Sequence, residues 1–74
     1  MRWLFLSSQE FNKTMEYIIQ AMREKGYDPY QQLRGYLLEN KPGYITRYKD
    51  ARTLIQRLDK EQVEQYLAQY EKKE

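Results

Sequence analysis

Apolar residues recur along this chain at intervals of three and four, which is the repeat expected of amphipathic α-helices. The first stripe predicts a helix over residues 8–25. Its members are Phe11, Met15, Ile18, Ile19 and Met22. Gly26 follows the stripe, where a left-handed glycine commonly ends a helix. At the other end Ser7 and Glu10 have capping-box spacing, and Leu6 and Phe11 flank them as a hydrophobic staple would.

A second helix is predicted to begin at Pro29, with Asp28 as its cap, and to end at the joint formed by residues 40–43. Its stripe consists of Tyr30, Leu33, Leu37 and Leu38. Gly35 lies inside this helix and costs roughly 1 kcal/mol relative to alanine. Either the helix tolerates this cost, or another helix crosses closely at that point.

The remaining pattern predicts a tight turn or short helix at residues 44–47, a third helix over 48–58, and a fourth helix after Asp59. Their inward residues are Ala51, Leu54, Ile55, Leu58, Val63, Tyr66, Leu67 and Tyr70. No alternation typical of a β-strand appears along the sequence. We therefore expect a compact all-α bundle of about four main helices.

The size and composition of the chain favour self-association. A domain of 74 residues buries little surface, and without cysteine or histidine it has neither disulfides nor the commonest metal ligands to stabilise it. The chain also has 8 tyrosines, which suit half-buried and interfacial positions. We therefore expect a homodimer, and the candidates for its contact are Tyr36, Tyr44 and Tyr48.

We divide the chain into a short apolar N-terminal tail (residues 1–7), a single helical domain (8–70) and a charged tail that frays (71–74). The longest apolar run, residues 3–6, is too short for a membrane helix or for the core of a signal peptide. A cytoplasmic location without membrane insertion is the resulting expectation.

Catalysis is not expected. The chain has no histidine, no cysteine and no glycine-rich phosphate loop, and its acidic residues lie mainly at helix caps and on outer faces. The sequence therefore predicts a protein that is not an enzyme and that holds no metal and no cofactor.

A modest basic face is predicted on the third helix. Lys49, Arg52 and Gln56 share this face, and Arg47 precedes them. It is either a plain solvated surface, a surface that docks a protein, or the recognition face of a helix-turn-helix DNA-binding protein. The net charge of only +2 favours protein over nucleic acid. We expect Arg52 to lie clearly off the buried stripe, whereas Arg47 can turn inward and support the turn.

Four segments of the chain resemble the IreB family, in the same order and spacing. They are "EKGYDPYQQLRGYLL", "PGYITRYKDAR", "LIQRL" and "EQVEQYLAQY". This family comprises small regulatory proteins of Gram-positive bacteria and includes the ReoM proteins. The resemblance covers residues 14–70, and the Glu-Lys-Gly-Tyr-x-Pro joint followed by Gly-Tyr-Leu-Leu is its most specific part.

The resemblance implies a helical homodimer without enzymatic activity that is a substrate of a membrane Ser/Thr kinase sensing the cell wall. It also implies control of peptidoglycan synthesis and of resistance to cell-wall antibiotics such as cephalosporins. The implied partners are a Clp protease component, an early cell-wall precursor enzyme and the kinase. The family's functional basic positions correspond to Arg47 and Arg52.

The chain departs from the family pattern in three places. Thr46 stands where members usually have proline, and Gln56 stands where a basic residue is common. Members carry phosphorylated threonines in a longer polar N-terminal tail, whereas residues 1–8 here contain no threonine. If a kinase acts on this tail, Ser7 or Ser8 is the expected site.

Overall fold

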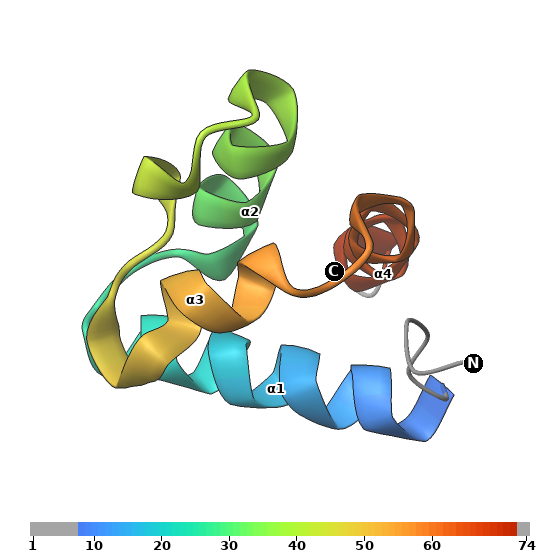
Figure 1. The fold of residues 1–74 in the computed structure, drawn as a ribbon, viewed down its shortest axis with the longest axis horizontal. Helices are drawn as coiled ribbons and strands as arrows, with labels where there is room; N and C mark the ends of the chain where they lie inside the picture. The colour runs from blue at the N-terminus through green and yellow to red at the C-terminus, as the bar shows by residue number, and fades with distance from the viewer. Residues whose placement is uncertain (1–7, 73–74) are drawn as a thin grey trace.

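The structure is a computed structural model and describes residues 8–72. Its α-helices are α1 (Ser8–Glu24), α2 (Pro29–Glu39), α3 (Ala51–Gln56) and α4 (Lys60–Lys72) (Figure 1). Two 3₁₀ turns, η1 (Pro42–Tyr44) and η2 (Tyr48–Asp50), lie between α2 and α3. No strand occurs in this part of the chain, and the predicted all-α fold with four main helices is confirmed.

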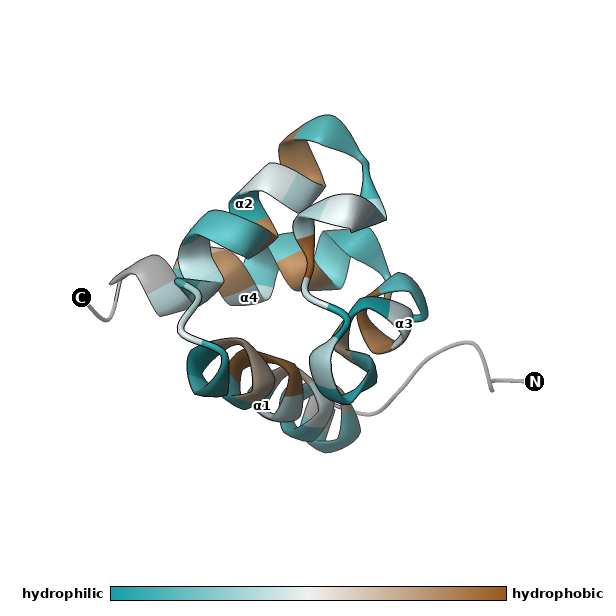
Figure 2. Cartoon of the chain, turned by 90° about the vertical axis from the view of Figure 1, so that its left-hand side faces the viewer, coloured by the Kyte–Doolittle hydropathy of each residue, from teal (hydrophilic) through white to brown (hydrophobic). Residues whose placement is uncertain are grey.

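The helices pack in two pairs that share one core. α3 lies on α1, α4 lies on α2, and the η1 and η2 turns pack on α2 and α1 respectively. In Figure 1 α4 is seen nearly end-on while α1 runs across the view, so these two helices cross steeply. Figure 2 shows apolar segments, in brown, on all four helices, including the outer end of α2.

The predicted stripe of α1 forms the middle of the core. All five of its members are buried, and Met15, Ile18 and Met22 are completely so. The other helices add Leu33, Ala51, Ile55, Val63 and Leu67, and the connection between α3 and α4 adds Leu58. Leu38 is the exception among the predicted core residues, because 70% of it is exposed.

Local signals at the helix ends gave the correct boundaries. Gly26 has φ +83°, and the N–H groups of Gly26 and Tyr27 donate to the carbonyls of Arg23 and Met22, which closes α1 as a Schellman motif. The Asp28 carboxylate accepts a hydrogen bond from the N–H of Tyr30 at 3.0 Å and caps α2. The predicted cap formed by Ser7 and its apolar neighbours lies outside the described residues.

The third helix is shorter than predicted. Lys49 and Asp50 both have left-handed backbone conformations, with φ values of 53° and 63°. Such a step cannot continue a right-handed helix. α3 therefore begins at Ala51 rather than at Tyr48, and it ends at Gln56 rather than at Leu58.

The close approach at Gly35 comes from a side chain. The ring of Tyr44, in η1, lies against the backbone of Gly35 in α2. The glycine thus accommodates a close neighbour, but that neighbour is an aromatic side chain and not the backbone of a crossing helix as expected.

Candidate docking surface

The segment between η1 and α3 is held in place at several points. We call residues 45–50 the 45–50 turn. Ile45 is fully buried, and the N–H of Thr46 donates to the side-chain oxygen of Gln32 on α2 at 3.1 Å. The Thr46 hydroxyl in turn accepts from the N–H of Tyr48 at 3.2 Å. Threonine at position 46 thus stabilises the turn through its side chain.

Arg52 is part of this support. Its Nε donates a hydrogen bond of 2.8 Å to the carbonyl of Ile45, and its side chain is half-buried. Arg52 is therefore not one of the buried residues of α3, but its side chain contacts the turn instead of facing solvent. Gln56, one helical turn later, is exposed and donates to the Arg52 carbonyl at 3.1 Å.

Of Arg47 and Arg52, Arg47 is the one that faces solvent. Its backbone carbonyl accepts the N–H of Asp50 at 3.1 Å, which fixes its main chain in η2. Its side chain is exposed and makes no hydrogen bond or ion pair within residues 8–72. The 45–50 turn therefore presents an unpaired guanidinium from a fixed backbone.

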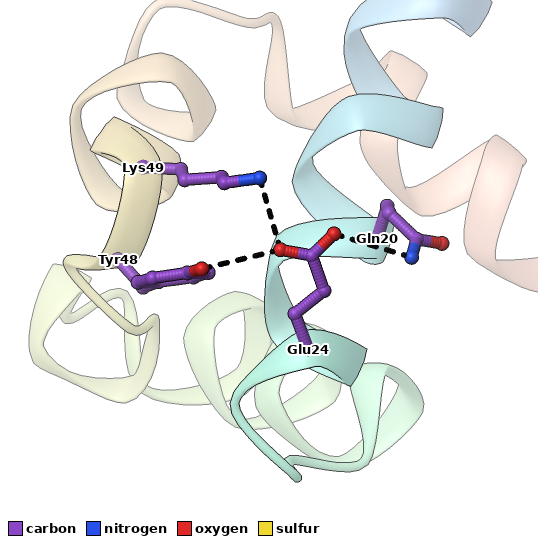
Figure 3. A network of polar contacts seen from close by, with 4 residues as sticks. All are labelled: Gln20, Glu24, Tyr48 and Lys49. Atoms are coloured by element: carbon purple, nitrogen blue, oxygen red, sulfur yellow. Dashed lines mark hydrogen bonds and ion pairs between the residues drawn. The ribbon is translucent and has the colours of Figure 1, made fainter.

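Lys49 is held by α1. Its ammonium lies 2.9 Å from a carboxylate oxygen of Glu24, which also accepts the hydroxyl of Tyr48 at 3.2 Å (Figure 3). The amide of Gln20 donates to the other Glu24 oxygen at 3.4 Å. The Lys49 ammonium holds the pKa of Glu24 below its ordinary value, and the Glu24 carboxylate raises the pKa of Lys49.

Two lysines lie over the ring of Tyr48. The Nζ atoms of Lys25 and Lys49 are 5.2 and 5.5 Å from the ring centroid, within the range of a cation–π contact. Sequence patterns did not single out Lys25 or Glu24, because nothing local relates the end of α1 to a turn more than twenty residues later.

The predicted basic residues do not share one helical face. Arg47 and Lys49 precede α3, Lys49 is paired with Glu24, and Arg52 contacts the turn. A helix-turn-helix joins its helices by three or four residues and inserts the second helix into DNA. Here residues 40–50 join the helices and α3 has only 6 residues, so this geometry does not favour DNA binding.

The three tyrosines proposed for a dimer contact differ in exposure. Tyr36 is only 3% exposed, so its expected role as an interface residue is corrected: it belongs to the core of its own chain, and burial raises the pKa of its phenol. Tyr48 is half-buried against α1. Tyr44 keeps 45% of its surface exposed and remains available to a partner.

Leu38 separates two open hollows on the outer side of α2. One, of about 520 Å³, is lined by Gly35, Leu38 and Tyr44 together with polar residues of α2. The other, of about 220 Å³, lies between α2 and α4 and is lined by Arg34, Leu37, Leu38, Glu64, Leu67 and Ala68. Sequence periodicity placed Leu38 in the core and so missed this surface.

Comparison with known protein families gives one match, over residues 4–72, to the IreB regulatory phosphoproteins. The chain belongs to the IreB family. The match confirms the resemblance seen in the sequence and covers nearly all of the chain. Membership gives this IreB protein a regulatory role, which agrees with the expectation that it is not an enzyme and favours protein partners.

Two further observations concern membrane-spanning helices and phosphorylation. None of the helices within residues 8–72 has the length and hydropathy needed to cross a bilayer. The family is described as phosphoproteins. Of the two serines expected to be modified, Ser7 lies outside the described residues, and Ser8 is the first residue of α1.

Proposed function

We propose that this IreB-family protein regulates peptidoglycan synthesis in the cytoplasm by docking onto another protein through the 45–50 turn. The resemblance to the family supports a setting in which a Clp protease degrades an early precursor enzyme and a Ser/Thr kinase controls the process. Resistance to cell-wall antibiotics then depends on how much of that enzyme survives. Phosphorylation at Ser7 or Ser8 is the proposed input from the kinase.

One observation carries this proposal: Arg47 is exposed and unpaired on a turn that is held at Ile45 and Thr46 on one side and at Lys49 on the other. Arginine is a frequent anchor of protein interfaces, and a fixed backbone lowers the entropy lost on binding. Arg47 therefore meets the requirements of a docking residue better than Lys49 or Arg52, which have partners within the chain.

We also propose that the protein is a homodimer, and that the outer side of α2 forms the contact. The α2–α4 hollow has apolar walls, with the cation Arg34 on α2 and the anion Glu64 on α4. Arg34 donates to the neutral hydroxyl of Tyr30, and Glu64 makes no ion pair within the described part of the chain. A two-fold axis would bring each Arg34 to the Glu64 of the second copy.

Affinity capture tests the docking proposal. The tagged full chain, its Arg47→Ala variant and an Arg57→Ala control are incubated with a lysate of the source cells treated with nuclease, and bound proteins are identified by mass spectrometry. We expect the wild type and the control to retain a Clp component or a cell-wall precursor enzyme, and Arg47→Ala to lose it. Equal retention by all three proteins contradicts docking through Arg47.

A further inference from the structure

The end of α1 and the segment that follows η1 carry most of the charge imbalance of this protein. Residues 24–25 and 45–52 contain four cations and two carboxylates. The cations are Lys25, Arg47, Lys49 and Arg52, and the carboxylates are those of Glu24 and Asp50. Their excess of two positive charges equals the net charge of the whole chain, +2, so the remaining residues are neutral in sum.

This region already binds a carboxylate of the chain itself. Three donors converge on Glu24, namely the Lys49 ammonium at 2.9 Å, the Tyr48 hydroxyl at 3.2 Å and the Gln20 amide at 3.4 Å (Figure 3). The contact shows that these donors bind a carboxylate. Lys25 lies over the Tyr48 ring, and Arg47 immediately precedes Tyr48 in the chain. Neither cation has an acidic partner within residues 8–72.

We infer that the cluster formed by Lys25, Arg47, Tyr48 and Lys49 receives an acidic segment of the protein partner. Lys25 and Arg47 bind its carboxylates beside the Tyr48 ring, and Glu24 competes with that segment for Lys49. The inference rests on the proposed docking function and names the chemistry of the partner.

An acidic protein segment fits this cluster better than a nucleic acid does. Proteins that bind a phosphate backbone tightly commonly make 6–10 phosphate contacts or so, along an extended basic track. The cluster here is short and contains an acid, so it matches a few carboxylates close together. The Tyr48 ring adds apolar contact area to such a site.

Fluorescence anisotropy with a labelled peptide of alternating glutamate and serine tests this inference on the full chain. Removal of one cation, by Lys25→Ala or Arg47→Ala, should weaken binding by about fivefold, the upper range for a single exposed ion pair. The charge-matched control Lys13→Ala removes an exposed cation from the first half of α1 and should leave binding unchanged. A peptide with glutamine in place of glutamate should not bind.

Removal of the competing carboxylate of Glu24 should change the affinity for the peptide in the opposite direction. Glu24→Gln removes the internal carboxylate and frees Lys49, so the affinity for the acidic peptide should rise by about fivefold. Glu61→Gln makes the same change in net charge at an exposed position in the first turn of α4, outside the proposed dimer contact, and should have no comparable effect. Circular dichroism melts of each variant establish that it remains folded at the temperature of the binding measurement.

Three results overturn the inference. They are equal losses in Lys13→Ala and Lys25→Ala, equal gains in Glu24→Gln and Glu61→Gln, and tighter cluster-dependent binding of a labelled DNA duplex. If Arg47→Ala abolishes capture of the partner while the acidic peptide does not bind, docking stands and the acidic partner is wrong. If the peptide binds through the cluster while Arg47→Ala captures the partner as well as the wild type does, the docking function is wrong instead.

Discussion

The ring of Tyr44 lies so close to the backbone of Gly35 that a Cβ atom at position 35 would be 2.7 Å from its Cδ1 atom. The absence of a side chain at position 35 of α2 therefore leaves room for an aromatic ring from η1. This contact anchors the start of the long connection between α2 and α3, and it explains why a residue that disfavours helices is found in the middle of one.

Gly35→Ala tests this contact. The change gains about 1 kcal/mol in helix propensity, but displacement of the ring costs about 1–3 kcal/mol, so we expect a net loss of about 1 kcal/mol. In a Tyr44→Ala background the same change should stabilise the protein by about 1 kcal/mol, because nothing then opposes the gain in propensity. Urea unfolding of the four proteins measures both differences. A gain of the same size in both backgrounds contradicts a role for the ring.

Arg47 in the 45–50 turn and Arg52 in α3 should differ in their effect on stability. Arg52→Ala leaves the buried carbonyl of Ile45 without its charged donor and should lower the free energy of unfolding by about 1.5 kcal/mol. Arg47→Ala removes an exposed side chain without a partner and should change it by less than about 0.5 kcal/mol.

Arg52→Lys provides the control for charge, because lysine keeps the cation but has no donor at the position of Nε. We expect it to recover only part of the lost stability in urea titrations. Should Arg47→Ala prove the more destabilising change, the roles assigned to the two arginines would have to be exchanged.

Sequence patterns predicted the parts of this fold that depend on neighbouring residues. The boundaries of α1 and α2 follow from Gly26, Asp28 and Pro29, each of which acts within one turn of the chain. The fourth helix was likewise found from Asp59, whose carboxylate accepts the N–H of Gln62 at 3.2 Å. These signals are local, so a sequence is sufficient to reveal them.

The missed features depend on contacts between distant residues. Lys49 and Asp50 adopt left-handed conformations without glycine, so no local signal marks the late start of α3. The inward role of Arg52 requires the Ile45 carbonyl to be placed first. The burial of Tyr36 could have been predicted, because its spacing of three from Leu33 continues the buried stripe, but its position at the edge of that stripe favoured an interface role instead.

The contact between Glu24 and Lys49 should make stability depend on pH. Lys49 lowers the pKa of Glu24 below its ordinary value of 4.5 in the folded protein. The ionised carboxylate therefore favours folding above this value, and that contribution is lost as the pH falls through the folded pKa. The raised pKa of Lys49 acts in the other direction, so its contribution is present below 10.5 and is lost when alkali deprotonates the folded lysine.

Glu24→Gln tests the acid side of this dependence. The stability difference between wild type and Glu24→Gln should be largest near neutral pH and should narrow as the carboxyl becomes protonated, from about pH 5 downward. When Lys49 is replaced by alanine, the stability difference between the proteins with Glu24 and with Gln at position 24 should change less with pH. A stability difference that stays constant down to about pH 3 would show that the contact between Glu24 and Lys49 does not affect folding.

The proposed dimer makes a prediction about exchange of charges. Arg34→Glu should weaken self-association, because it places two carboxylates opposite each other at each of the two symmetric contacts, and Glu64→Arg should do so by placing two cations there. An equal mixture of the two variants should associate again, because every contact between unlike chains then joins a glutamate to an arginine. Sedimentation equilibrium of each variant and of the mixture measures this directly.

Leu38→Glu should weaken association in every combination, since it puts a charge at the exposed apolar centre of the same face. Two outcomes contradict this interface: a mixture that stays as monomeric as its components, and a wild type that is monomeric throughout the high micromolar range.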